Sequence, residues 1–253
     1  MRDFLCLLTG SSLPEIYVDR LYRMLKRHMP EPFRLVCMTE RPRKFAEPVE
    51  ILDISGWEVF RPDMRTTQHR LRYFASETCP LDEFISIDVT LVIKKNLGPM
   101  LEFVDSRPEE LVIVDDWNRP TVNGSVMRVR RSDALRQIYD DYAAGVRHNV
   151  KLHGDQDYID AVIQAGKLHA HVAHFPEDMV VSYKNLRRLN RRNPKLAQEK
   201  LERSLILKFH GKPRPHEVFD WRYHLRTAWR YPRHMFKDPR FAVDVVDREW
   251  RKV

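Results

Sequence analysis

The sequence predicts an α/β fold built around a largely parallel central β-sheet. Short apolar segments alternate along the chain with amphipathic helical patterns, and this alternation is typical of α/β proteins. Of the 253 residues, 43% are hydrophobic, which is enough for a sizeable core. Polar residues follow several of the apolar segments, as they do where parallel strands end beside a ligand.

The first half of the chain begins with strand, helix and strand. The first strand is expected at residues 3–9, where the segment DFLCLLT is almost entirely apolar. A helix is expected over residues 14–29, because Val18, Leu21 and Leu25 share one face and Pro14 suits a first turn. Further strands are expected at residues 33–39, 49–54 and 84–88, the last continued after a break by 90–93, and a helical segment at 66–76.

The second half continues the alternation. One helix is expected after Ser132, a residue type suited to cap it, and another from residue 155 to Gly166, which suits a helix end. The basic run at residues 184–195, KNLRRLNRRNPK, predicts an exposed loop, with a rim facing an acceptor or a phosphate as the alternative. Strands are expected at residues 111–116, 123–129, 179–183 and 204–209.

Charge and cysteine usage restrict the class of protein. The formal net charge of +8 favours an anionic partner, which is a nucleic acid, an acidic membrane surface or a phosphorylated substrate. No apolar run approaches the roughly 18 residues of a membrane span, and the segment MRDFLCLLTGSS is interpreted as a strand rather than a signal peptide. The scattered cysteines Cys6, Cys37 and Cys79 predict a reduced, cytoplasmic protein in which they pack as small hydrophobes.

Polar residues follow four of the expected strands, and we expect these strand ends to converge on one edge. The residues are Thr9 to Ser12, Asp88 with Thr90, Asp115 with Asp116, and His210 to Lys212. Glycine-rich dinucleotide and P-loop motifs are absent from the sequence. A carboxylate, a hydroxyl and an imidazole suit a hard divalent ion that bridges two phosphates, and a lysine neutralises the same phosphates. The pattern indicates a site for a diphosphate leaving group.

Four motifs in order resemble a known family. They are FISIDVTLVIKKNL (84–97), NGSVM (123–127), GDQDYI (154–159) and HGKP (210–213). Together with the opening strand–helix–strand segment they resemble bacterial nucleotide-sugar glycosyltransferases of the GT-A fold, close to glycosyltransferase family eight. The resemblance covers about residues 3–218. It implies a single GT-A-type, Rossmann-like domain over residues 1–218, with residues 219–253 as a basic, aromatic carboxyl-terminal extension.

The resemblance implies an activity and its residues. A sugar would pass from a nucleotide-diphosphate sugar to an acceptor hydroxyl, with retention of anomeric configuration. Asp88 and His210 would hold Mn²⁺ or Mg²⁺, with Thr90 at the third metal position. Lys212 would contact the diphosphate. The remaining implied residues are Thr9, Gly10, Tyr17 and Arg70 for the nucleotide and donor, Asn123 for the donor sugar, and Asp155 and Gln156 as catalytic residues.

Thr90 departs from the family pattern, because it replaces the second carboxylate of an Asp-x-Asp motif. A neutral hydroxyl is a poorer ligand for a hard cation than a carboxylate. The metal would then bind weakly or only with the donor, or cationic side chains would replace it. A second hypothesis follows, in which the chain is a catalytically inactive nucleotide-sugar or glycan-binding protein. A third, nucleic-acid binding, lacks a supporting motif.

The extension interleaves aromatic and basic residues. Aromatic rings suit the headgroup boundary of a membrane, and cations attract anionic lipid. We therefore expect a peripheral protein on the inner face of a membrane, with a glycan or lipid-linked acceptor; the alternative is a helix packed on the domain with its arginines outward. The residues are Trp221, Arg222, Tyr223, Arg226, Trp229, Arg230, Tyr231, Arg233, Phe236, Lys237, Arg240 and Phe241.

Overall fold

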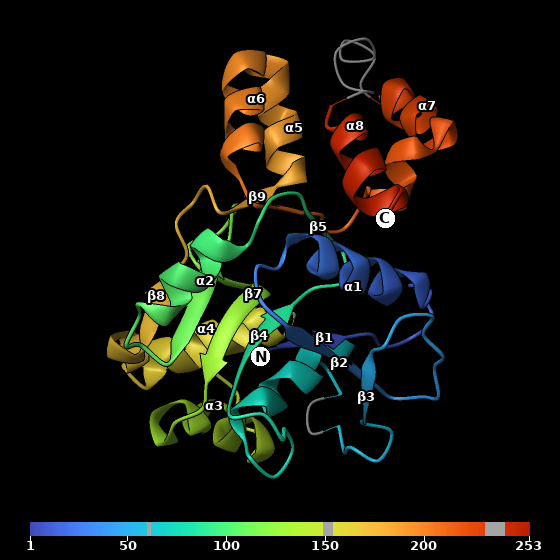
Figure 1. Cartoon of the computed structure of the whole chain (residues 1–253). Coiled ribbons are helices and arrows are strands. Elements are labelled where there is room, and N and C mark those ends of the chain that lie inside the picture. Colours follow the sequence, from blue (N-terminus) through green and yellow to red (C-terminus); the bar gives the residue numbers. More distant parts are fainter. Residues whose placement is uncertain (60–61, 149–153, 231–240) are drawn as a thin grey trace. The chain divides into compact units, whose positions relative to one another are not determined.

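Residues 1–59, 62–148, 154–230 and 241–253 are described by a computed structural model (Figure 1). The chain divides into two units, which are described separately below. The first unit contains Met1–Val18, Glu31–Val89 and Pro99–Phe175, and the second contains Asp19–Pro30, Thr90–Gly98 and Pro176–Val253. The boundary expected after residue 218 stays a prediction. No helix in the described ranges is long and apolar enough to cross a membrane.

The first unit contains the predicted central sheet. Its strand order is β3-β2-β1-β4-β7-β6-β8, and its pairs are parallel except where β7 runs antiparallel to β4 and β6. The α/β class and the mostly parallel sheet are therefore confirmed. The strands are β1 (Arg2–Leu7), β2 (Phe33–Thr39), β3 (Glu50–Asp53), β4 (Glu83–Ile87), β6 (Leu111–Asp115), β7 (Val122–Arg130) and β8 (Val172–His174).

Helices α1, η1, α3 and α4 begin and end within a few residues of the predicted positions, whereas α2 and η2 were not predicted. The hydroxyl of Ser132 accepts a hydrogen bond from Leu135 N at 3.3 Å and so caps α3, and Gly166 ends α4. α1 begins in the first unit and continues in the second. The helices are α1 (Ile16–His28), the 3₁₀ helix η1 (Thr66–Phe74), α2 (Gly98–Asp105), α3 (Asp133–Ala143), α4 (Asp155–Ala165) and the 3₁₀ helix η2 (Leu168–His171).

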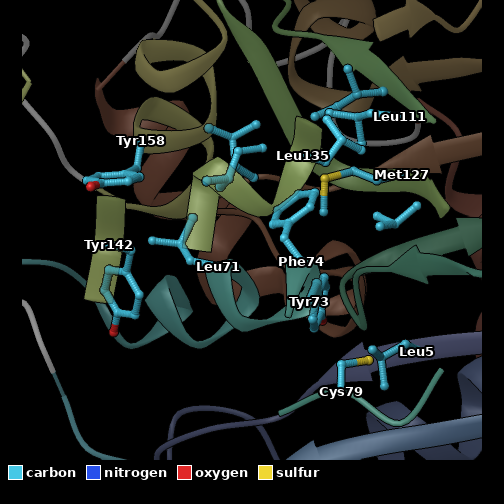
Figure 2. Close-up of a cluster of buried hydrophobic side chains, with 14 of the residues drawn as sticks. Leu5, Leu71, Tyr73, Phe74, Cys79, Leu111, Met127, Leu135, Tyr142 and Tyr158 are labelled. Carbon is cyan, nitrogen blue, oxygen red and sulfur yellow. The ribbon is translucent and has the colours of Figure 1, made fainter. Parts of the chain in front are cut away.

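The apolar core of the first unit joins the sheet to η1, α3 and α4 (Figure 2). Tyr73 of η1 packs edge-on against Phe84 of β4, with ring centroids 5.3 Å apart. The Tyr142 hydroxyl donates to Gln68 Oε1 at 2.7 Å, so the buried phenol is satisfied. Each fully buried side chain of this size contributes about 1.5–3 kcal/mol. The three cysteines are free and buried, as predicted.

A buried arginine donates hydrogen bonds to backbone carbonyls at the carboxyl-terminal end of α2. Arg128 of β7 has no exposed surface, and its Nη2 donates to the carbonyl oxygens of Val104 at 3.2 Å and Arg107 at 3.0 Å. The last carbonyls of a helix have no partner within the helix, and cations are favourable at this end. Arg128 therefore ties β7 to the end of α2 through backbone carbonyl groups.

The second unit contains a separate three-stranded sheet of order β5-β10-β9, in which β10 is antiparallel to β5 and parallel to β9. Helices α5 and α6 of this unit lie side by side (Figure 1). The strands are β5 (Leu91–Ile93), β9 (Val180–Ser182) and β10 (Ile206–Lys208). The helices are α5 (Tyr183–Arg192), α6 (Pro194–Arg203), the 3₁₀ helix η3 (Pro215–Phe219), α7 (Trp221–Arg230), α8 (Val243–Val246) and the π-helical turn η5 (Asp247–Arg251).

Two predictions of local structure in this unit are wrong. Residues 90–93 do not continue β4, because the chain turns after Asp88 and β5 pairs with β10 in the second sheet. The basic run at residues 184–195 is helical rather than a loop. Ser182 caps α5 by accepting from Asn185 N at 3.2 Å, and Asn193 caps α6 by accepting from Leu196 N at 3.0 Å.

The end of the chain packs within the second unit, so the expectation of a membrane-facing ring is wrong for Phe241 and Trp250 of the extension, which are buried. Trp250 is 1% exposed, and the Arg20 guanidinium lies 3.9 Å from its ring centroid. Glu249 accepts from His28 at 3.0 Å and from Arg27 at 3.2 Å. Of the predicted extension, Tyr231, Arg233, Phe236, Lys237 and Arg240 lie outside the described residues, as do the side chains of Arg226 and Arg230.

The role of Arg128 gives a test of the fold. Replacing Arg128 by Met leaves buried carbonyls without donors, so we expect the free energy of unfolding to fall by about 2–4 kcal/mol. Arg130→Met on the same strand is the control, because Arg130 forms a half-exposed pair with Glu83 at 3.2 Å and should cost about 1 kcal/mol or less. Urea denaturation of both variants measures the difference, and equal losses would contradict this role of Arg128.

Candidate active site

The carboxyl ends of β1, β4 and β6 lie at the same edge of the central sheet. β1 and β4 are parallel neighbours, and β4 and β6 are both antiparallel to β7, so the three strands run the same way. Thr9, Asp88 and Asp116 follow these strands, as predicted. The expected convergence of all four strand ends is wrong for His210, because β10 belongs to the sheet of the second unit.

A buried arginine joins two of the predicted residues at this edge. Arg70 on η1 forms an ion pair with Asp88 through Nη2, and its Nη1 contacts Asp155 Oδ2 at 3.1 Å and the Gly124 carbonyl at 3.3 Å. The side chains of Arg70, Asp88 and Asp155 are 8%, 19% and 7% exposed. We call these three residues the Arg70 cluster. Burial opposes the charge on Arg70, but the two carboxylates outweigh it and raise its pKa well above the usual value, so the guanidinium is always charged.

Local structure explains why these residues meet. Asp155 is the first residue of α4, with Gly154 at the cap position, and a carboxylate is favourable at a helix amino terminus. Asp155 therefore lies inside the helix and is not its cap residue. A Cβ atom at position 124 would lie 3.1 Å from Asp155 Oδ2, so β7 needs a glycine where the cluster approaches its backbone.

Asn123 and Gln156 are joined by Asp116, one of the polar residues that the sequence placed at the strand ends without giving it a specific role. Asn123 Nδ2 donates to Asp116 Oδ2 at 2.8 Å, and Gln156 Nε2 lies 3.4 Å from the same oxygen. Asn123 Oδ1 in turn accepts from Ser125 N at 3.1 Å. The only signal in the sequence was the position of Asp116 directly after an apolar strand. The structure thus brings together two of the predicted residues through this carboxylate.

The loop after β1 is fixed by side chains that the sequence analysis missed. Gly10 has φ of +67°, a conformation that favours glycine. Its N–H donates to Glu40 Oε1 at 2.9 Å, and its carbonyl accepts from Arg43 Nη2 at 2.7 Å. Arg43 also pairs with Glu15 at 2.7 Å. These contacts hold the Gly10 backbone in one conformation at the edge of the sheet.

The two remaining predicted nucleotide contacts lie in different environments. Thr9 Oγ1 donates to Thr66 Oγ1 at 3.2 Å, which ties the loop after β1 to the start of η1. Tyr17 is 1% exposed near the start of α1, so its ring is part of the packed interior. The assignment of either residue to the nucleotide stays a prediction.

In the second unit Thr90 contacts a lysine and a carbonyl. Lys208 Nζ donates to Thr90 Oγ1 at 2.9 Å, and the same hydroxyl donates to the Phe209 carbonyl at 3.1 Å. Lys208 is 4% exposed. Ser182 Oγ and His210 Nε2 are hydrogen-bonded at 2.5 Å, and Ser182 pairs in register with Lys208. Lys208 was not predicted as a functional residue.

Further basic groups lie near Gly211, whose φ is +70°. A Cβ atom at this position would lie 3.6 Å from Lys184 Nζ. Lys212 precedes a cis peptide bond to Pro213, is 73% exposed and pairs with Glu217 at 3.5 Å. His210 and Lys212 flank Gly211 in the chain and Lys184 Nζ lies close to it, so an anion at this turn would meet basic side chains.

A cavity of about 300 Å³ lies in the first unit, beside the hydrogen-bonded group of Asp116, Asn123 and Gln156. Asp115 and Val122 line it, and these residues directly precede Asp116 and Asn123 in the chain. Its polar lining also includes Arg119, Asp160, His169 and His174. Of the residues that the sequence placed at the converging strand ends, Asp115 lines this cavity, whereas the residues predicted to bind the donor or the metal do not.

The residues at the predicted metal positions do not fit a hard divalent ion. Asp88 is already paired with Arg70, and the Thr90 hydroxyl accepts a hydrogen bond from an ammonium group. An ion on the same hydroxyl would be repelled by Lys208 at close range. Within the described residues, no three His, Cys, Asp or Glu side chains gather in a way that could hold a metal ion.

Comparison with solved structures identifies similar folds. The galactosyltransferase LgtC, solved with donor and acceptor sugar analogues, has a TM-score of 0.54 and 13% identity over 89% of this chain and 94% of its own. The glycosyltransferase GlyE of Streptococcus pneumoniae TIGR4 has a TM-score of 0.60 and 14% identity, and this chain spans 64% of it. Mouse xyloside xylosyltransferase 1 has a TM-score of 0.52 and 13% identity over 84% of this chain and 98% of its own. No family profile and no curated protein sequence matches the chain.

The Arg70 cluster gives a stability test. Arg70→Leu leaves two largely buried carboxylates without their cation, so the free energy of unfolding should fall by about 3–5 kcal/mol. Adding Asp155→Leu should recover part of this loss, because one unpaired charge is removed. Arg119→Leu is the control, since Arg119 is 54% exposed and pairs with Asp157 at 3.5 Å. Chemical denaturation would contradict the account if the double variant were no more stable than Arg70→Leu.

Proposed function

We propose that this chain, which has the GT-A fold of nucleotide-sugar glycosyltransferases, transfers a sugar from a nucleotide-diphosphate sugar to an acceptor hydroxyl. The observation that carries the proposal is the Arg70 cluster, which lies at the carboxyl ends of β1 and β4. This is the edge at which open α/β sheets bind their ligands. The order of the four motifs in the sequence supports the same activity.

We assign the reacting centre to Asp155 and Gln156. Both lie in the first turn of α4, where Arg70 fixes the Asp155 carboxylate and Asp116 contacts the Gln156 amide. A fixed carboxylate stabilises positive charge that develops on the anomeric carbon as the diphosphate leaves. The Gln156 amide and Asn123 would orient the sugar through its hydroxyls. Retention of configuration follows from the family resemblance and belongs to this proposal.

We assign the leaving group to basic residues. His210 and Lys212 would bind the diphosphate, and Lys184 beside Gly211 adds a further cation. Negative charge grows on the diphosphate as the glycosidic bond breaks, so cations placed there lower the barrier. Thr9 and Gly10 would contact the nucleotide, whereas the buried ring of Tyr17 is given no contact with it. The Mn²⁺ or Mg²⁺ ion that the resemblance implies does not fit the donor atoms at Asp88 and Thr90, so no step of this mechanism uses it.

The alternative function is binding of a nucleotide sugar or glycan without transfer. Thr90 supports it, because the chain lacks the second carboxylate of the Asp-x-Asp motif. The intact Arg70 cluster and the Asp155–Gln156 pair favour an enzyme, since simple binding needs no fixed carboxylate at the reacting carbon. Release of nucleoside diphosphate distinguishes the two functions.

Helix α7 supports a membrane-facing acceptor. Trp221, Leu225 and Trp229 follow one another at four-residue spacing on one face of α7, and they are 64%, 55% and 94% exposed. Arginines alternate with them along the sequence, at positions 222, 226 and 230. Exposed tryptophans with neighbouring cations suit an anionic lipid surface. We therefore propose peripheral attachment to the inner face of a membrane and a glycan or lipid-linked acceptor there.

Catalysis is tested with a panel of nucleotide sugars, first by thermal shift and then by release of nucleoside diphosphate. Asp155→Asn should lower turnover by about 10²-fold or more, because charge stabilisation in the transition state is lost. Asp157→Asn, in the same turn of α4, is the control and should retain activity. If neither the wild-type protein nor the control releases nucleoside diphosphate from any bound donor, the chain is a binding protein and the proposal fails.

Membrane attachment is tested by co-sedimentation with vesicles. Wild-type protein should bind anionic but not neutral vesicles, and salt should weaken the binding, because each basic residue contributes about 1 kcal/mol and is screened. Trp221→Ala with Trp229→Ala should weaken it further, whereas Leu196→Ala, which removes an exposed apolar group from α6, should not. Equal binding by all three proteins would contradict the role of α7. Tight, salt-sensitive binding to arbitrary DNA instead would favour the nucleic-acid hypothesis.

A further inference from the structure

We infer that Lys208 is a built-in cation that binds the donor diphosphate in place of a divalent metal ion. The inference rests on the proposed function and names the group that neutralises its leaving group. It is carried by the contact between Lys208 Nζ and Thr90 Oγ1 at 2.9 Å. Thr90 is the residue that stands where the family pattern has its second carboxylate.

The sheet of the second unit fixes the position of this cation. Lys208 is the last residue of β10, and it pairs in register with Leu91 of β5 and Ser182 of β9. Thr90 directly precedes β5, and its backbone carbonyl accepts from Phe209 N at 3.0 Å. Strand pairing therefore holds the lysine and the threonine together at one end of the sheet, and the ammonium needs little reorganisation to bind an anion.

The surroundings of Lys208 favour an anion. Ser182 on the neighbouring strand is hydrogen-bonded to His210, and Lys184 Nζ lies near Gly211 in the turn that follows, where Lys212 is paired with Glu217. A diphosphate has several oxygen acceptors and at least two negative charges, so it can contact more than one of these groups. An ammonium is a compact point charge that suits phosphate without strict geometry.

A hydroxyl rather than a carboxylate at position 90 is consistent with a lysine that takes the place of a metal ion. A metal-binding carboxylate next to Lys208 would form an ion pair with it and lose affinity for an ion. Thr90 instead accepts the hydrogen bond from Lys208 through a hydroxyl that carries no charge. Asp88, at the other carboxylate position, is paired with Arg70 within the first unit. Both motif positions, Asp88 and Thr90, therefore already contact a cationic side chain of the protein itself.

Lys94 offers a matched control at the opposite end of the same strand pair. It follows β5, is 8% exposed and donates through Nζ to the Ser204 carbonyl before β10. Burial lowers its pKa to about 8. Lys94 thus shares with Lys208 its residue type, its burial and its sheet, but it lies away from Thr90, Ser182 and His210.

The test is a calorimetric titration with inorganic pyrophosphate and with uridine, cytidine, guanosine and adenosine diphosphates. Wild-type protein should bind pyrophosphate and at least one nucleoside diphosphate in EDTA, and added Mg²⁺ or Mn²⁺ should change the affinity by less than about threefold. Lys208→Met should weaken binding by about 10- to 100-fold, the loss expected for a hydrogen bond to a charged group. Lys94→Met should bind as the wild type does.

A second pair of variants separates charge from structure. Lys208→Arg keeps the positive charge and should keep binding in EDTA. Thr90→Asp combined with Lys208→Met restores a carboxylate and removes the cation, so its binding should require Mn²⁺. A purely structural role for Lys208 would produce neither result. If Lys208→Met fails to fold by circular dichroism, the wild-type titration in EDTA and the Lys208→Arg variant decide the question.

The outcomes separate this inference from the proposed function. Binding by the wild type that disappears in EDTA and returns with metal overturns the inference and leaves the glycosyltransferase proposal in place. Absence of binding for every diphosphate, with and without metal, overturns both. Equal weakening by Lys208→Met and Lys94→Met also overturns the inference, because it would show a general effect of removing a buried lysine.

Discussion

The ion pairs of Arg70 with Asp88 and Asp155 are the interaction on which the site of the first unit depends. They join η1 and the end of β4 to the start of α4, which lies far from both in the sequence. The charges are largely buried, so removing the cation would leave two carboxylates without compensation. The same contacts bring the Asp155 carboxylate close to the backbone of Gly124. They also hold the first residue of α4, the helix on which the proposed catalytic residues lie.

The second unit also contains a buried cationic side chain at this motif, which is a lysine rather than an arginine. Lys208 contacts Thr90 within a short three-stranded sheet, and His210 is held by Ser182 on the neighbouring strand. The two ends of the segment Asp88-Val89-Thr90 therefore contact cations that belong to the chain itself. A protein that provides its own positive charge at such a motif has less need of an external ion, and this links the altered motif to the basic residues around it.

Much of the fold could be predicted from local patterns, but strand partners and charge partners could not. The cap at Ser132 and the helix end at Gly166 are local signals, and both predictions are confirmed. The separate sheet formed by β5 and β10 was missed, because pairing over more than a hundred residues leaves no local pattern. The basic run was interpreted as a loop because of its high charge, although Ser182 and Asn193 are residue types that cap helices. Asp116 and Lys208 gain their roles from nonlocal contacts, which residue type alone does not reveal.

A crystal structure with bound nucleoside diphosphate, grown in EDTA, tests the central claim most directly. The account predicts diphosphate oxygens within hydrogen-bonding distance of Lys208 Nζ, with the ion pair between Arg70 and Asp88 intact. A nucleoside diphosphate bound away from Lys208 would contradict the account, as would a complex that forms only with a divalent ion ligated by Asp88 in place of Arg70.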